Sequence, residues 1–365
     1  MRGAPWTGCS VGASRLSAPY ANGSTSKMHR AAPSTGLTAI SGGPNGGSSL
    51  VVFITRRFAV TIPLLLMISF GVFALIHIAP GDPVSSLLGA RASDPATLAA
   101  IRARYHLDDS LLLQYGTWLS QVIRGDLGVS ILGNRSVTST IADRLGVTIF
   151  LSLMSTTLVL GLGILLGALA AFRRGTGLDR TVVMFSVFGI SSPAFVTGIF
   201  FLYVFGVLLH WFPTFGAGTG FLDRAWHLTL PALALAASTM AIVVKITRAA
   251  VIEELARDYV TFARARGVSS RRILLAYVLR NSLIPVVTAA GLIVIGIVAG
   301  AIYVEVTFSL PGLGALMIDA VQKRDIPTIQ GITLLFSAFV VLVNVAVDVL
   351  YTLIDPRIRF GRVGS

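Results

Sequence analysis

The segment EELARDYVTFARARGVSSRRILLAYVLRNSLIP, residues Glu253–Pro285, decides how this chain is to be read. It is helix-prone and basic, and it lies between two long apolar runs. From Lys245 to Arg280 the chain carries eight Lys/Arg and three acidic residues. Nothing in the segment has the pattern of a catalytic motif. A basic helical insert between apolar runs indicates a surface at one face of a membrane, on which a partner can act to move a membrane domain.

The composition of the chain indicates a membrane protein. Of its 365 residues, 54% are hydrophobic and 12% are charged, and the mean hydropathy is +0.80. Six apolar segments are each long enough to cross a hydrocarbon core of about 30 Å, since a helix rises about 1.5 Å per residue. They cover roughly residues 58–79, 147–172, 182–209, 229–248, 283–304 and 330–353. The sequence therefore predicts an all-α membrane protein with six transmembrane helices.

The distribution of charge predicts the orientation of these spans. The N-terminal segment, the 173–180 loop, the 245–280 region and the C-terminal tail together hold twenty Lys/Arg and five acidic residues, whereas the rest holds nine and eleven. Lys and Arg are enriched on the cytoplasmic side of membrane proteins. We therefore expect both termini and a 249–282 loop in the cytoplasm. The net charge of +13 follows this topology and does not indicate a nucleic-acid-binding protein.

The first 50 residues differ from the rest of the chain. They are rich in Gly, Ser, Ala and Pro and show no hydrophobic period. Such a composition buries too little apolar surface to offset chain entropy, so we expect residues 1–50 to be disordered. An alternative is that the natural chain begins later, near Met28 or around Val51. The membrane domain is expected over residues 51–360, followed by a short tail, 361–365.

The segment between the first two expected spans, residues 80–146, is too long for a turn and is expected outside the cytoplasm. Asp94-Pro95 predicts the start of a short helix, because proline is favoured in the first helical turn. Ser110 predicts the start of a second, amphipathic helix, which the glycines of residues 125–128 end. We interpret these helices as a cover over the outer mouth of the membrane domain. A structural cap without substrate contact is equally consistent with the pattern.

Two GxxxG pairs lie in the expected spans: Gly163 with Gly167 in the second, and Gly296 with Gly300 in the fifth. Small residues at this spacing let helix backbones approach closely in lipid. We interpret both pairs as packing sites, with a contact to another subunit as the alternative.

The common motifs of enzymes and metal sites are missing from the sequence. It has no GxxxxGK[ST] phosphate loop and no HExxH motif, its five histidines are scattered, and Cys9 is its single cysteine. The acidic residues of the expected spans are Asp348 and, at a membrane border, Glu305. Two such acids could form a proton relay, so a proton-coupled secondary carrier is an alternative. The simpler interpretation of Asp348 is a structural polar contact.

The basic insert itself predicts a docking surface. Residues 258–266 are expected to form a short helix on which Tyr259, Phe262 and Ala263 make one compact face, and Gly267 permits a sharp turn. A short amphipathic helix across the cytoplasmic surface suits a groove on a partner. The alternative is a basic loop held by anionic lipid headgroups. That alternative explains the arginines but not the apolar face.

The remainder of the insert is expected to lead back into the membrane. Ser269 or Ser270 caps a further helix that runs to Asn281. Pro285 is then expected to open the fifth span, since proline is tolerated in a first helical turn.

Seven motifs between residues 55 and 360 occur in an order that points to a family. They are Pro80-Gly81-Asp82-Pro83, Gly125-Asp126-Leu127-Gly128, Asp258-Tyr259 with Ala263-Arg264-Ala265-Arg266-Gly267, Arg280-Asn281 with Ile284-Pro285, Pro311-Gly312-Leu313-Gly314, Arg324-Asp325-Ile326-Pro327, and Asp355-Pro356-Arg357-Ile358-Arg359. As a set they resemble the inner-membrane permease subunit of peptide-importing ABC transporters, in the dipeptide, oligopeptide and nickel branch. Residues 1–50 have no counterpart in that family.

The resemblance implies a fold, a location and partners. The fold would be the type I ABC importer permease arrangement in a bacterial inner membrane, with a helical extracytoplasmic segment after the first span. The partners would be a second, homologous permease, two cytoplasmic ATP-binding subunits and an extracytoplasmic substrate-binding protein, with a peptide as substrate. The chain itself would hold no cofactor and be no enzyme, since the ATPase subunits bind ATP and Mg²⁺.

The basic insert resembles the coupling helix of this family. The residues that the resemblance assigns to contact with the ATPases are Asp258, Tyr259, Thr261, Phe262, Ala263, Arg264, Ala265, Arg266 and Gly267. The general motif of ABC importers has Glu six residues before the glycine, where this chain has Thr261. Within the same class of machine, nickel, glutathione or another small solute are alternatives to di- and oligopeptides as cargo.

Overall fold

The computed structural model describes residues 59, 61–74, 109–130 and 133–354. All of these residues belong to one compact unit, Gly47–Ser365. They are helical apart from turns, bends and one isolated antiparallel bridge between Val129 and Ser136. The expected disordered extension, the short helix after Asp94-Pro95 and the C-terminal tail lie outside the described residues.

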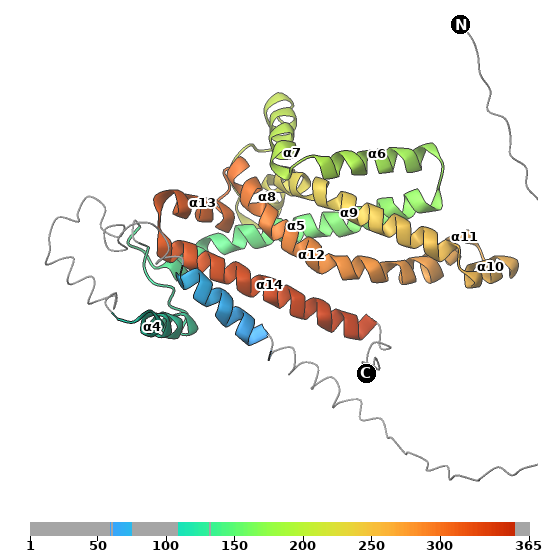
Figure 1. Cartoon of the computed structure of the whole chain (residues 1–365). Coiled ribbons are helices and arrows are strands. Elements are labelled where there is room, and N and C mark those ends of the chain that lie inside the picture. Colours follow the sequence, from blue (N-terminus) through green and yellow to red (C-terminus); the bar gives the residue numbers. More distant parts are fainter. Residues whose placement is uncertain (1–58, 60, 75–108, 131–132, 355–365) are drawn as a thin grey trace, which may run out of the picture. The chain divides into compact units, whose positions relative to one another are not determined.

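A series of helices makes up the described part of the chain (Figure 1). An apolar helix, Thr61–Ala74, is the described part of the first expected span. The others are α4 (Leu111–Ile123), α5 (Val137–Phe172), α6 (Gly177–Ser191), α7 (Ala194–Phe201), η2 (Leu202–Leu208), α8 (Gly220–His227), α9 (Thr229–Leu255), α10 (Asp258–Ala265), α11 (Ser270–Arg272), η3 (Ile273–Val278), α12 (Leu279–Thr307), α13 (Leu313–Lys323) and α14 (Ile326–Ile354). The elements η2 and η3 are π-helical turns.

Within the described residues, four helical segments are long and apolar enough to cross a membrane. They are Val137–Phe172, Thr229–Leu255, Ser270–Thr307 and Ile326–Leu350. The third of them is longer than the sequence predicted, because α11, η3 and α12 form one helix that begins at Ser270. The expectation that Pro285 opens this span is wrong, since Pro285 lies inside α12. A proline is tolerated within a membrane helix where nearby groups satisfy the carbonyl that it leaves free.

The expected span over residues 182–209 is not one straight helix. α6 ends at Ser191 and α7 begins at Ala194, and the two helices are bent by 106°. Ser192 is extended, with ψ 118°, which is the conformation that a residue before proline prefers. Pro193 has no N–H to continue the hydrogen bonds of α6. The α6–α7 pair is therefore a broken span or a re-entrant loop.

α9 is the central helix of the bundle and packs against α5, α6, α7 and α12 (Figure 1). The main core includes Leu151 of α5, Leu235 and Val243 of α9, and Ile297 of α12, all of which are buried. Because lipid tails are themselves apolar, such helices associate through close packing rather than through exclusion of water.

Glycines of α5 allow α5 and α9 to approach closely. A Cβ atom built at Gly163 would lie 2.8 Å from a side-chain atom of α9, and one built at Gly167 would lie 2.7 Å from another. The predicted packing role of this GxxxG pair is therefore confirmed within the chain. In the second pair only Gly300 meets α9, because nothing lies within 4 Å of a Cβ atom at Gly296.

Candidate functional site

α10 is a short helix that follows α9 almost directly, at the end of the bundle opposite to α4 and α13 (Figure 1). The corner between α9 and α10 is sharp because Arg257 is extended, with φ −70° and ψ 147°. Asp258 occupies the first turn of α10, where its negative charge stabilises the positive end of the helix dipole. These local features turn the chain away from the direction of α9.

The C-terminal end of α10 confirms the turn predicted at Gly267. The Gly267 N–H donates a hydrogen bond to the Arg264 carbonyl, and the Val268 N–H donates one to the Ala263 carbonyl. This pair of bonds is a Schellman cap. Gly267 has φ +74°, the left-handed conformation that the cap requires and that side chains disfavour.

One face of α10 packs onto the bundle. Val260 is fully buried, and Tyr259 and Ala263 pack with it against a small core that α5, α9 and η3 supply. The prediction that Tyr259, Phe262 and Ala263 form one docking face is wrong, because Tyr259 and Ala263 pack against the bundle and only Phe262, 70% exposed, is accessible to a partner. At about 100° per residue, Phe262 lies roughly 100° away from the centre of the packed face.

Tyr259 joins three helices through hydrogen bonds. Its hydroxyl donates to the Glu254 carboxylate of α9 at 2.5 Å and accepts from the Asn281 amide of α12 at 3.3 Å. Arg257 forms ion pairs with Glu253 at 2.9 Å and with Glu254 at 3.7 Å. Burial, and then the bond to Glu254, raise the pKa of the Tyr259 hydroxyl, so it stays protonated as a donor at neutral pH. The base of α10 is thereby fixed to α9 and α12.

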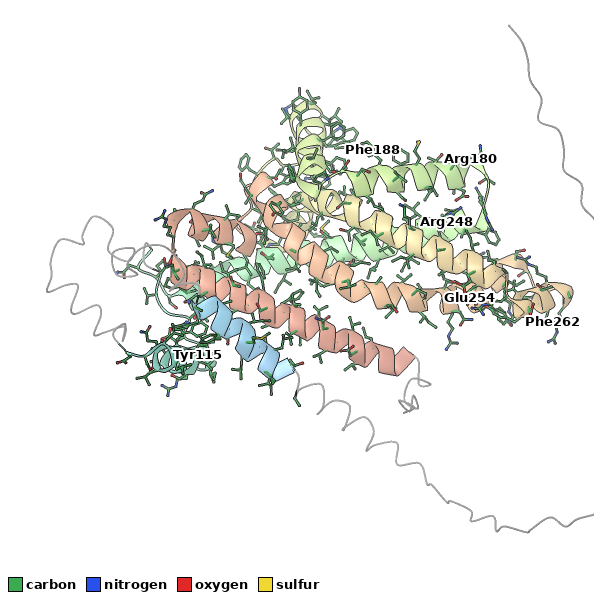
Figure 2. The ribbon with its side chains drawn as sticks, viewed as in Figure 1. Tyr115, Arg180, Phe188, Arg248, Glu254 and Phe262 are labelled. Atoms are coloured by element: carbon green, nitrogen blue, oxygen red, sulfur yellow. The ribbon has the colours of Figure 1, made fainter. Side chains whose placement is uncertain are left out.

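The opposite face of α10 is free of contacts that would bury it. This exposed face consists of Thr261, Phe262, Arg264, Ala265 and Arg266. Figure 2 labels Phe262 and Glu254 at this end of the bundle. An accessible aromatic ring between arginines has the composition of a protein-docking surface, in which aromatic residues and Arg are enriched. Of the nine residues assigned to coupling, Tyr259 and Ala263 face inward, Asp258 and the exposed face are accessible, and Gly267 forms the turn.

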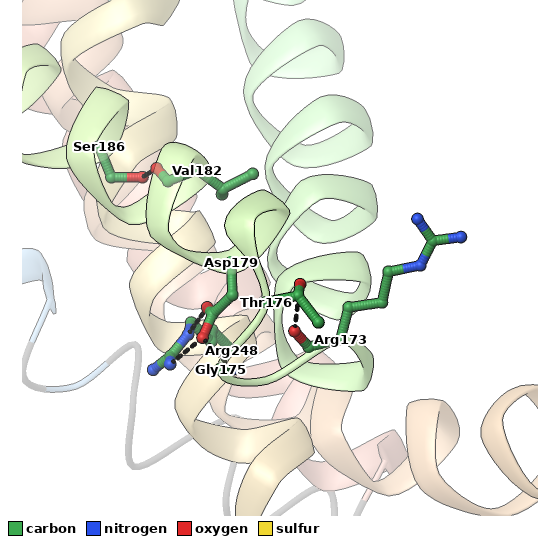
Figure 3. Close-up of polar contacts among 7 residues, drawn as sticks. All are labelled: Arg173, Gly175, Thr176, Asp179, Val182, Ser186 and Arg248. Carbon is green, nitrogen blue, oxygen red and sulfur yellow. Dashed lines mark hydrogen bonds and ion pairs between the residues drawn. The ribbon is translucent and has the colours of Figure 1, made fainter.

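An ion pair that sequence reasoning did not identify connects α9 with α6 (Figure 3). The Arg248 guanidinium donates to both carboxylate oxygens of Asp179, at 2.7 Å and 2.9 Å. The Gly175 N–H donates to the same carboxylate at 3.0 Å. Asp179 is buried and Arg248 is partly exposed. The sequence gave no signal for this pair, because its members are 69 residues apart and each has the charge expected near a membrane surface.

Glu305 is fully buried and holds the first turn of α13. Its carboxylate accepts hydrogen bonds from the Thr148 hydroxyl at 2.6 Å and from the Gly314 and Ala315 N–H groups at 2.7 Å and 3.2 Å. The Leu313 N–H donates to Thr148. A negative charge at this position satisfies the unpaired N–H groups of a helix start. The glycines of the Pro311–Gly314 motif leave room for that carboxylate.

The two acids considered for a proton relay lie apart. Val347, next to Asp348, meets α12 at Gly291. Glu305 lies fourteen residues further along α12, which at about 1.5 Å per residue is a separation of roughly 21 Å. The two carboxylates are therefore too far apart to exchange a proton directly. Among the residues that the structure describes, no group of three or more His, Cys, Asp or Glu is placed to hold a metal ion.

Several apolar crossings in a helical bundle, with an exposed basic helix at one end, define a multi-pass membrane protein. Comparison with known families specifies its type. Residues 163–360 match the family described as "Binding-protein-dependent transport system inner membrane component", and residues 50–152 match the N-terminal membrane component of the same systems. The chain belongs to this family of inner-membrane permease components, so the predicted membership is confirmed.

Curated relatives match the chain along almost their whole length. The glutathione transport system permease protein GsiC of Escherichia coli K12 is 39% identical over 308 residues, which are 84% of this chain and 99% of that protein. A putative peptide permease protein of Brucella suis is 38% identical over 314 residues, 84% of this chain and 98% of that protein. A probable peptide ABC transporter permease protein of Sinorhizobium fredii is 36% identical over 312 residues, 85% of this chain and 99% of that protein.

Proposed function

We propose that this chain is one of two permease subunits of an ATP-driven importer and forms half of its translocation pathway for di- or oligopeptides. Membership of the binding-protein-dependent family supports a machine with an extracytoplasmic binding protein and cytoplasmic ATPases. The observation that carries the proposal is the exposed face of α10, with Phe262 70% accessible. Because the sequence has no phosphate loop, energy from ATP has to reach the chain through such a surface.

The proposal includes six spans in a bacterial inner membrane, with both termini in the cytoplasm. Four long apolar helices, the α6–α7 pair counted once and Thr61–Ala74 support this number. The excess of Lys/Arg on one set of loops supports the orientation. In this topology α10 lies on the cytoplasmic side, and α4 and α13 lie on the extracytoplasmic side.

The exposed face of α10 docks into a groove on an ATPase subunit, and the packed face passes the movement on. Closure of the ATPase pair on ATP pushes α10. The hydrogen bond from Tyr259 to Glu254 holds α10 to the end of α9, so α9 moves with it. The Asp179–Arg248 pair then carries the movement to α6, the first half of the bent span. A partner can drive a change between two conformations of the permease only if it binds one of them more tightly than the other. Closure of the ATPase pair on ATP supplies that difference in affinity.

The cargo that we favour is a short peptide. Relatives with peptide or glutathione permease in their names support this class, and glutathione is itself a small peptide. Glutathione is therefore the second candidate for cargo. Uptake of a labelled dipeptide, glutathione and Ni²⁺ by the assembled importer would separate the cargo classes, and uptake of Ni²⁺ alone would contradict our choice.

Two substitutions in α10 test the docking role. Ala263→Asp places a charge in the packed core under α10, and Gly267→Val forces a β-branched residue into φ +74°. We expect both variants to insert in the membrane normally but to retain less ATPase subunit on purification and to lose ATP-driven uptake.

The matched control for the turn is Gly267→Asn, because Asn tolerates the left-handed conformation. This variant should keep most of the binding and uptake. Normal uptake by Ala263→Asp in reconstituted vesicles would contradict a coupling role for α10.

A further inference from the structure

α4 has an unusual composition for a helix outside the expected spans. Its sequence, LLLQYGTWLSQVI, contains no charged residue over 13 positions. Charged side chains are the usual means by which a surface helix stays soluble. α4 therefore requires a surrounding other than bulk water along part of its surface.

The side chains of α4 form three stripes, since successive residues are about 100° apart around a helix. The protein stripe is Leu111, Tyr115, Trp118 and Val122, with the buried Gln114 at its edge. The apolar stripe is Leu112, Gly116, Leu119 and Ile123. The polar stripe is Thr117, Ser120, Gln121 and the C-cap residue Arg124, with Leu113 at its edge. The apolar and polar stripes lie side by side on the half of α4 that turns away from the protein stripe.

The protein stripe fastens α4 to the apolar helix Thr61–Ala74. The Tyr115 ring lies edge-on to Phe70 at a centroid distance of 5.2 Å, and the Trp118 ring lies 5.6 Å from Phe73. The Tyr115 hydroxyl is hydrogen-bonded to the Ser69 hydroxyl at 2.7 Å. Figure 1 shows α4 nearly end-on, whereas Thr61–Ala74 and α14 are seen from the side, so α4 crosses these helices.

The apolar stripe is strongly exposed. Leu112 is 73% and Ile123 is 78% accessible. Leaving a large aliphatic side chain in water instead of an apolar medium is unfavourable. The neighbouring apolar helix exposes Met67 to 67%, and that side chain faces acyl chains if the helix spans the membrane. Exposed apolar side chains therefore occur both on α4 and on the apolar helix that it contacts.

We propose that α4 lies in the plane of the membrane, at the boundary between headgroups and acyl chains on the extracytoplasmic side. Its apolar stripe contacts lipid, its polar stripe contacts water and headgroups, and its protein stripe contacts the first span. Tyr115 and Trp118 are the residue types that concentrate at this depth. A helix with adjacent apolar and polar stripes is suited to such an interface. This role adds to the proposed function, and it does not depend on transport or on the cargo.

The depth of each stripe can be measured by site-directed spin labelling. Cys9 is first replaced by Ser, and single cysteines then replace Leu112 or Ile123 on the apolar stripe, or Thr117 or Gln121 on the polar stripe. The nitroxide-labelled protein is reconstituted in phosphatidylethanolamine–phosphatidylglycerol vesicles. Power saturation compares collisions with O₂, which concentrates in lipid, and with a water-soluble nickel chelate. Labels at Met67 and Thr261 serve as the lipid and water references.

We expect O₂ to be several-fold more accessible than the nickel chelate at both apolar-stripe positions, and the reverse at both polar-stripe positions. High access to the nickel chelate at all four positions would show that α4 is solvated and would overturn the proposal. Low access to both reagents at the apolar stripe would show that protein covers the stripe, and this result would also overturn the proposal. Gly267→Val is the variant that is expected to lose transport. The same four labels in a Gly267→Val protein should report the same depths, because the position of α4 does not depend on transport.

Discussion

Phe262 is the residue on which the docking proposal makes its sharpest prediction. Loss of an aromatic anchor from a protein–protein interface typically costs about 2 kcal/mol or more. Phe262→Ala is therefore expected to weaken binding of the ATPase subunits about 30-fold, since 1.4 kcal/mol corresponds to a factor of ten. A binding titration with the permease held in lipid nanodiscs measures this change.

The control for Phe262 is Phe221→Ala on α8. The Phe221 side chain is 73% exposed but belongs to a different part of the bundle. Its truncation should leave ATPase affinity unchanged. Equal affinity of the Phe262→Ala protein and the unaltered protein would count against docking through the exposed face of α10.

Single residues also show where sequence reasoning stops. The turn at Gly267 could be predicted, because glycine after a short helix has a local physical cause. The side of α10 on which Phe262 lies could not be predicted, because α10 is short and has apolar residues on more than one side. The core beneath it combines α9 and η3 with Ala168 and Ala171 of α5, which are distant in the sequence, and that core selects Val260 instead. Glu305 was noticed as a possible relay member, but its role at the start of α13 depends on Thr148, 157 residues away.

At the scale of elements, the Asp179–Arg248 pair is proposed to make α6 move with α9. Asp179→Asn removes one partner and leaves the Arg248 guanidinium without its bidentate acceptor. We expect the number of substrate molecules imported per ATP hydrolysed to fall several-fold, while ATP hydrolysis continues. A purely structural role would instead lower both rates together through loss of folded protein. Parallel assays of uptake and phosphate release on the same vesicles distinguish these outcomes.

An exposed ion pair on the same helix provides the comparison. Glu253 pairs with Arg257 at 2.9 Å, but its side chain is 72% accessible, and exposed pairs contribute about 0–1 kcal/mol. Glu253→Gln should therefore leave the import stoichiometry unchanged. The double exchange Asp179→Arg with Arg248→Asp restores opposite charges and should recover part of the coupling. If Asp179→Asn and Glu253→Gln have the same import stoichiometry, the Asp179–Arg248 pair does not transmit the movement.

The contact of α5 with α9 makes a prediction about stability. An added Cβ atom at Gly167 would lie 2.7 Å from Thr247 and 2.8 Å from the Val244 carbonyl, so the two helices would have to separate. Gly167→Ala is expected to destabilise the protein by about 1–3 kcal/mol, as overpacking does. Gly161→Ala, on the same helix but with nothing within 4 Å, should stabilise it by about 0.5–1 kcal/mol. Thermal unfolding in detergent compares the two variants. Shifts of the unfolding temperature in the same direction for Gly167→Ala and Gly161→Ala would contradict the packing described for α5.

The elements themselves were predictable where length and apolar content decide them. Four of the expected spans overlap long apolar helices, because a hydrocarbon core demands both properties at once. The helix start at Ser269 or Ser270 was predicted, but the bend at Pro193 and the unbroken continuation of that helix through Pro285 were not, because apolar runs alone do not show how the backbone bends or where one helix continues into the next. Ser192 and Pro193 did provide a local signal for the bend, which the uniform hydropathy of residues 182–209 obscured.

At the scale of the whole molecule, the features of the chain favour a subunit that is driven by others. α10 exposes Phe262 together with Arg264 and Arg266, and it is connected to the centre of the bundle through α9. The sequence predicted this class of function through its resemblance to a permease family, which seven motifs between residues 55 and 360 carry, and the charge asymmetry supported the orientation. The connection from α10 to α6 required the structure.

The most direct test of the account is uptake of a labelled peptide by vesicles that contain this chain, its partner permease, both ATPase subunits and the binding protein. We predict uptake that requires every component and ATP, continues when a protonophore collapses the proton gradient, and is lost in the Phe262→Ala variant. Uptake by this chain alone, driven by a proton gradient without ATP, would contradict the account.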